Sequence, residues 1–135
     1  MEEKHVVTCF LEHRGKIAIF LRSQQVGTYR GRWAGISGYI EPGTTPYKQA
    51  LQQLKEEAGL GEGDVSLVKE GAPLEVVDEG IDRKWVVHPY RFAVLEPARI
   101  RMDWEHVEMR WINPEELVQY ETVPRLAETW ERVAE

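Results

Sequence analysis

The sequence lacks the features of a membrane or disulfide-bonded protein. Its 135 residues include only one cysteine, Cys9, so no intramolecular disulfide can form. No apolar run is long enough to span a bilayer, and the first residues lack the pattern of a signal peptide. We therefore expect a cytoplasmic protein with no membrane partner, in which Cys9 is buried within the apolar segment 6–11.

Acidic residues outnumber basic residues in this sequence. The chain has 17 Lys and Arg residues against 23 Asp and Glu residues, for a formal net charge of −6. This balance opposes diffuse binding to nucleic acid, so we expect no nucleic-acid partner. An anionic small molecule would need local positive charge or a metal ion. The sequence leaves open whether the chain forms a homodimer.

No repeat, low-complexity segment or linker divides the chain, so we expect one domain over residues 1–135. Residue patterns predict strands at 5–11, 16–22, 33–40, 65–69, 74–78, 84–95 and 109–112, and helices at 46–58, 113–120 and from 122 onward. Pro89 interrupts the segment 84–95, which predicts an edge strand or a bulge. The fold class is therefore α/β with a mixed sheet.

The helix at 46–58 has clear signals at both ends. Thr45 suits the N-cap, Pro46 the first helical position, and Gly59 the left-handed residue after the end. Helical periodicity predicts one packed apolar face. It predicts a second, polar and acidic face formed by Gln49, Gln53, Glu56 and Glu57.

Glu56 and Glu57 lie in the last turn of this helix, where acidic side chains are unfavourable because the carbonyl end carries partial negative charge. On its own, such a pair is most often a solvated helix surface. The segment 30–38, which precedes the helix, is basic and contains glycine. This context favours a functional interpretation in which a divalent cation compensates the charge of Glu56 and Glu57.

These residues resemble the Nudix box, G-x5-E-x7-R-E-U-x-E-E-x-G-U, where U is aliphatic. Six positions match it in register: Gly38, Leu54, Glu56, Glu57, Gly59 and Leu60. At the positions where the family has Glu, Arg and Glu, this chain has Thr44, Gln52 and Gln53. The box is therefore degenerate in its charged part, although the resemblance covers nearly the whole chain.

The resemblance implies an α/β/α sandwich and a hydrolase that cleaves a pyrophosphate bond in a nucleoside diphosphate derivative, with Mg²⁺ or Mn²⁺ as cofactor. It implies metal ligands at Glu56, Glu57 and the carbonyl of Ser37. A later acidic residue would complete the metal shell or act as the base. Glu105 matches that position better than Glu108 by spacing.

Substrate contacts are predicted by residue type, because Arg and Lys suit phosphate and aromatic rings suit a base. The phosphate candidates are Arg22, Arg30, Arg32, Arg83 and Lys84, and the stacking candidates are Tyr29, Trp33 and Trp85.

The segments 87–90 and 121–126 also resemble archaeal Nudix domains associated with relatives of initiation factor 2B and ribose-phosphate isomerases. That resemblance suggests a ribose-containing substrate.

Two functions of different class follow. The first is a metal-dependent Nudix hydrolase in which Glu56, Glu57 and Glu105 hold metal, and in which Glu105 or Glu108 replaces Gln53 as base. The second is a Nudix-fold module that binds a nucleotide or sugar phosphate without turnover. The poorly placed Glu56 and Glu57 pair favours the hydrolase.

Overall fold

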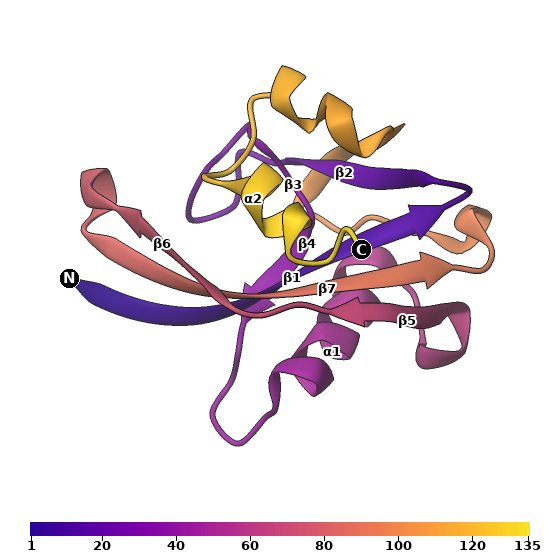
Figure 1. Cartoon of the computed structure of the whole chain (residues 1–135), viewed down its shortest axis with the longest axis horizontal. Helices are drawn as coiled ribbons and strands as arrows, with labels where there is room; N and C mark the ends of the chain where they lie inside the picture. The colour runs from indigo at the N-terminus through magenta and orange to yellow at the C-terminus, as the bar shows by residue number, and fades with distance from the viewer.

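Two strands far apart in the sequence form the centre of the sheet (Figure 1). In the computed structural model, which describes residues 1–135, β1 (Glu2–His13) and β7 (Arg83–Val94) run parallel. Their register runs from Glu2 beside Arg83 to Glu12 beside Ala93. All other strands are arranged on either side of this pair.

The sheet has eight strands, and its main path follows the order β3-β2-β1-β7-β5. Of the strands off this path, β4 pairs with β1, β6 with β7, and β8 with β2. The remaining strands are β2 (Lys16–Arg22), β3 (Trp33–Ala34), β4 (Ile36–Tyr39), β5 (Val65–Glu70), β6 (Leu74–Asp78) and β8 (His106–Ile112). The α-helices are α1 (Pro46–Ala58) and α2 (Leu126–Glu131), and 3-10 helices span Glu62–Asp64, Glu79–Ile81, Pro97–Arg99 and Pro114–Gln119.

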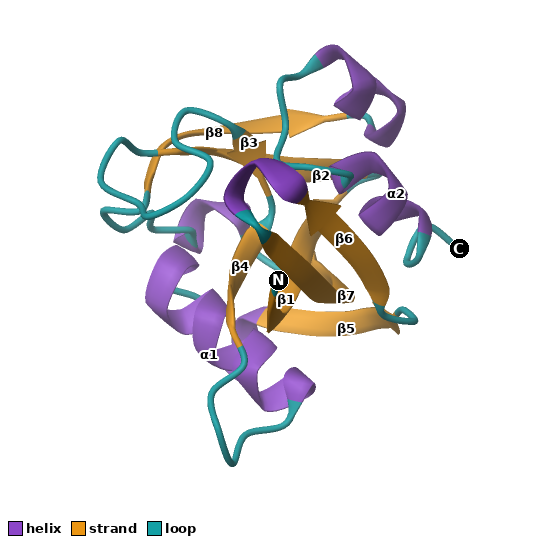
Figure 2. Cartoon of the chain, turned by 90° about the vertical axis from the view of Figure 1, so that its left-hand side faces the viewer, coloured by secondary structure: helices purple, strands orange, loops and turns teal.

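Helices cover both faces of the sheet (Figure 2). On β1, alternate residues point to opposite faces, so Cys9 and Leu11 pack with α1 while Phe10 packs with α2. The first core also contains Leu54 of α1, and the second contains Trp130 of α2. The expected α/β/α sandwich with a mixed sheet is therefore confirmed.

Local signals predicted most element positions correctly. Helix α1 has the predicted bounds, the Thr45 hydroxyl accepts a hydrogen bond from the Lys48 N–H at 3.2 Å, and Gly59 is left-handed with φ 67°. Cys9 is fully buried, as expected. Two C-terminal elements differ: the predicted helix at 113–120 is a 3-10 helix, and the last helix begins at Leu126 rather than near residue 122.

The expectation that Pro89 marks an edge strand or a bulge is wrong. β7 lies between β1 on one side and β5 and β6 on the other, and its register with β1 passes through Pro89 without a shift. The Pro89 carbonyl accepts from the Gly71 N–H at 2.9 Å, so its nitrogen also points toward β5 and β6. Gly71 lies in the gap between those two strands. An interior proline is tolerated there because no strand needs its missing N–H.

The polar face predicted for α1 is largely buried. Gln49 and Glu57 are each 1 % exposed and Gln53 is 8 % exposed, so these three side chains are buried rather than solvated. Glu56 alone among the four remains exposed. Gly38 of β4 allows this burial, because a Cβ at that position would lie 2.3 Å from Cδ of Gln53.

None of the helices has the length and hydrophobicity needed to cross a membrane.

Candidate active site

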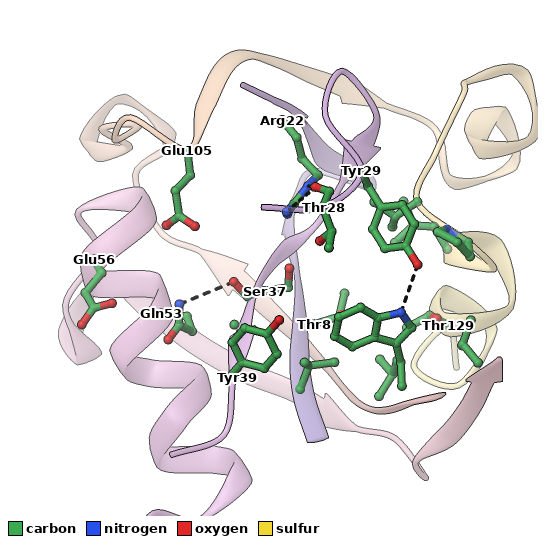
Figure 3. Close-up of a pocket in the computed structure, with 18 of the residues that line it drawn as sticks. Thr8, Arg22, Thr28, Tyr29, Ser37, Tyr39, Gln53, Glu56, Glu105 and Thr129 are labelled. Carbon is green, nitrogen blue, oxygen red and sulfur yellow. Dashed lines mark hydrogen bonds between the residues drawn. The ribbon is translucent and has the colours of Figure 1, made fainter. Parts of the chain in front are cut away.

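A cavity of about 340 Å³ opens beside the C-terminal half of α1 (Figure 3). Its walls come from β1, β4, β6, β7 and α1, from the loops after β2 and before β8, and from α2 with the segment that leads into it. One end is charged and the other is aromatic. This volume is within the range of small-molecule sites in proteins.

The charged end contains Arg22, Glu56 and Glu105. Glu105 reaches from the loop before β8 toward α1, where Glu56 lies (Figure 3). Burial and the neighbouring Asp103 carboxylate raise the pKa of Glu105 to about 7, and Glu56 adds to this shift. Arg22 donates from Nε and Nη2 to the Thr28 carbonyl at 3.1 and 2.9 Å, so its guanidinium is fixed beside the cavity.

Glu57 lies behind this end and does not line the cavity. Its carboxylate accepts a hydrogen bond from Nε2 of Gln53. Burial raises the pKa of Glu57 to about 9, and the charge of Glu105 acts in the same direction. Glu56 and Glu57 are adjacent in sequence, yet they occupy opposite environments.

His106 packs next to Glu57 with 5 % of its surface exposed. Its Nε2 lies 4.0 Å from Oε1 of Glu57 and its Nδ1 lies 4.0 Å from Oδ1 of Asp103, and neither nitrogen has a hydrogen-bond partner in the protein. Burial lowers the pKa of His106 to about 4, so the ring is neutral at pH 7. Glu105 lines the cavity whereas His106 is buried, and Glu105 lies in the turn that precedes β8 rather than in the strand itself.

Aromatic side chains form the other end of the cavity. The rings of Tyr39 and Trp85 lie 6.1 Å apart between centroids and are tilted by 33°. The Trp85 indole N–H donates to the Tyr29 hydroxyl at 3.0 Å, and Tyr29 donates to Asp78 at 2.7 Å. These bonds fix an aromatic wall that offers a flat surface to a base.

Of the five phosphate candidates, Arg22 lines the cavity, whereas Arg30, Arg32, Arg83 and Lys84 do not, and the stacking candidate Trp33 also lies outside it. Arg32 pairs with Glu121 at 3.5 Å, and Trp33 is buried in the α2 core. Lys84 pairs with Glu75 at 3.1 Å. Glu108 also lies outside the cavity, where it accepts from Arg110 at 2.7 Å. Of the stacking candidates, Tyr29 and Trp85 lie in its wall.

Several cavity residues were not predicted from the sequence, among them the polar side chains of Thr8, Tyr39 and Thr129. Thr8 had a detectable signal, because it is the one hydroxyl in an otherwise apolar strand segment and is 8 % exposed. Tyr39 and Thr129 had none, since their positions depend on how β4 and α2 pack.

The donor types at the charged end suit a hard divalent cation. No three His, Cys, Asp or Glu side chains lie close enough together to hold a metal ion. However, Mg²⁺ in enzymes of phosphate compounds is commonly bound by one or two carboxylates, with waters and substrate phosphates completing its shell. Glu56 and Glu105 meet that requirement, and their mutual repulsion is what a cation would relieve.

Fold and cavity together define a class of small α/β proteins in which a carboxylate from a helix and another from a loop lie beside a ligand-sized cavity. The profile described as the NUDIX domain matches residues 2–133. The chain therefore belongs to the Nudix family, as the box predicted. The narrower resemblance to domains associated with initiation factor 2B gains no support from the comparisons.

Known relatives agree with this assignment. The chain is 27 % identical to a CTP pyrophosphohydrolase of Escherichia coli (strain K12), over 92 % of this chain and 86 % of that protein. It is 27 % identical to an asymmetrical bis(5'-nucleosyl)-tetraphosphatase of Sus scrofa, over 64 % and 59 % respectively. The crystal structure of a MutT protein from Methanosarcina mazei Go1 superimposes with a TM-score of 0.81 at 18 % identity, covering 98 % of this chain and 94 % of that one.

Proposed function

We propose that this protein is a hydrolase that cleaves a pyrophosphate bond in a nucleotide derivative, with a divalent cation as cofactor. The observation that carries the proposal is the two-ended cavity, in which Glu56 and Glu105 lie at one end and Tyr39 and Trp85 at the other. A nucleotide has the matching chemistry, with an anionic phosphate chain at one end and a flat base at the other.

At the charged end, Glu56 and Glu105 would hold Mg²⁺ or Mn²⁺. When bound, the cation would neutralise phosphate charge and lower the pKa of a water molecule that attacks phosphorus. Arg22 would bind a phosphate oxygen and orient the chain for attack, since a guanidinium fork matches that geometry. Its bonds to the Thr28 carbonyl would keep it in place as the substrate enters.

At the aromatic end, Tyr39 and Trp85 would contact the base. Stacking of a base on an aromatic ring contributes about 1–3 kcal/mol. Thr8 and Thr129 line the same region and offer hydroxyl groups to polar atoms of a base or ribose. CTP and dinucleoside tetraphosphates are the first substrates to test, because the two relatives are named for these compounds.

We also propose a cytoplasmic setting and a small-molecule substrate rather than nucleic acid. The buried, unpaired Cys9 needs no oxidising compartment. The net charge of −6 disfavours a polyanionic partner.

The test is a substrate panel with the purified protein and Mg²⁺ or Mn²⁺. It would contain nucleoside triphosphates, dinucleoside polyphosphates, ADP-ribose and sugar nucleotides. We expect at least one to be hydrolysed, and Glu56→Gln to reduce the rate at least 100-fold while the protein remains folded. Saturable binding of a nucleotide without turnover would overturn the hydrolase and identify a binding module, which the neutral Gln52 and Gln53 would then explain.

A further inference from the structure

A ladder of buried amide side chains runs along α1 toward Glu57. The backbone N–H of Glu41 donates to Oε1 of Gln49 at 3.1 Å, and Nε2 of Gln49 donates to Oε1 of Gln53 at 2.6 Å. Nε2 of Gln53 then donates to Glu57 and, over a longer distance of 3.5 Å, to the carbonyl of Ser37.

The direction of this ladder is fixed by its first member. A backbone N–H can only donate, so Gln49 must present its oxygen to Glu41 and its amino group to Gln53. Gln53 must then accept with its oxygen and direct its own amino group toward Ser37 and Glu57. The Ser37 carbonyl and Glu57, which the Nudix resemblance implied as metal ligands, therefore both face a hydrogen-bond donor. Figure 3 shows the hydrogen bond from Gln53 to Ser37.

The Gln53 amide also has little room to move away. It is 8 % exposed and lies against the backbone of Gly38, where an added Cβ would come within 2.3 Å of Cδ. Hydrogen bonds to Gln49 and Glu57 hold it from two sides. A cation that touched both Ser37 and Glu57 would have to displace this amide.

We propose that the Gln53 amide takes the place of a divalent cation between Ser37 and Glu57, so that the chain binds metal only at the outer position of Glu56 and Glu105. This inference rests on the proposed function, which supplies the outer ion. The amide satisfies the same two oxygens that a cation would, but it brings no net charge and cannot activate water. The inner position becomes a metal site only when residue 53 carries a carboxylate.

The experiment is a crystal of the wild-type protein soaked in Mn²⁺ and examined by anomalous scattering, with Mn²⁺ equivalents counted in solution by calorimetry. Crystals of Gln53→Glu would be treated in the same way. Gln52→Glu is the matched control, because it adds the same charge one residue away, beside the exposed Glu56. In the wild type we expect no Mn²⁺ at coordination distance, about 2.1 Å, from the Ser37 oxygen and Glu57.

Gln53→Glu should show one additional ion touching those two groups and one additional equivalent in solution, whereas Gln52→Glu should show no inner ion. An inner ion in the wild type would overturn the inference. So would a folded Gln53→Glu protein with no inner ion, and the wild-type crystal alone is decisive if that variant does not fold. A wild-type crystal with no ion at Glu56 and Glu105 would instead count against the proposed function. Failure of the inference and failure of the proposed function are therefore distinguishable.

Discussion

Trp85 and Tyr29 are joined by a hydrogen bond of 3.0 Å from the indole N–H to the tyrosine hydroxyl. Tyr29 has a positive φ of 50°, which is uncommon for a residue with a side chain. Its bond to Asp78 connects the loop after β2 to β6. This pair therefore fixes the aromatic end of the cavity at the cost of an unfavourable backbone conformation.

Replacing Tyr29 with Phe should destabilise the protein by about 1–3 kcal/mol, because Trp85 and Asp78 both lose their partner. Nucleotide affinity should also fall, since the aromatic wall would be less ordered. Urea unfolding and nucleotide titration would measure the two effects. Tyr47→Phe is a control outside the cavity, in a ring that packs on Tyr90 and Phe92. Equal effects of the two changes would contradict the role given to the Tyr29 hydroxyl.

Glu105→Gln should lower kcat by at least about 100-fold, since removal of one member of a catalytic unit commonly has effects of this size. Glu108→Gln should leave kcat within about twofold of wild type. Glu108 is a matched control because it is a carboxylate three residues away that pairs with Arg110 outside the cavity. Steady-state assays of both variants would decide, and similar rates would remove Glu105 from the mechanism.

Glu57 should make the metal-free protein less stable as pH rises from about 4.5 to about 9. Burial raises its folded-state pKa to about 9 from an ordinary value of 4.5. The folded state therefore binds more protons than the unfolded state between these limits, and the free energy of unfolding falls with pH in that window. Glu57→Gln should flatten this dependence.

Thermal unfolding at several pH values in the presence of a chelator would measure the effect of Glu57. Glu56→Gln is the control, because Glu56 is exposed on the same turn of α1. A wild-type stability that stays constant between pH 5 and pH 9 would show that Glu57 is not held in a desolvated position.

Gly38→Ala should destabilise the protein by about 1–3 kcal/mol, as expected for overpacking, because the new Cβ would overlap the Gln53 amide. Gly63→Ala is the matched control, since nothing lies within 4 Å of a Cβ at that position. Chemical denaturation of both variants would give the difference. A Gly38→Ala protein as stable as wild type would mean that the Gln53 amide moves freely. That result would contradict the proposal that this amide occupies the position between Ser37 and Glu57.

Elements with local signals could be predicted from the sequence. Thr45, Pro46 and Gly59 mark the ends of α1 with their own side-chain and backbone chemistry. The left-handed Arg14 and Gly15 likewise make the turn that ends β1 and starts β2. No knowledge of distant residues was needed in either case.

The cavity could not be predicted in the same way, because its members meet only through long-range pairing. Trp85 comes to Tyr29 since β7 lies beside β1, and the register of that pairing has no local signal. Helical periodicity did place Gln49, Gln53 and Glu57 on one line. It could not show that β4 would cover them, which depends on the missing side chain at Gly38.

The parallel pairing of β1 and β7 also bears on how the chain folds as it is synthesised. β1 is synthesised well before β7, which pairs with one edge of β1 and ends at Val94. Until then that edge presents unpaired backbone donors and acceptors, the feature that promotes association between nascent chains. Pairing so distant in sequence also slows folding. β2 and β4 can pair with β1 earlier, but completion of the sheet must wait for β7. We therefore expect expression yield to depend on chaperone supply and growth temperature.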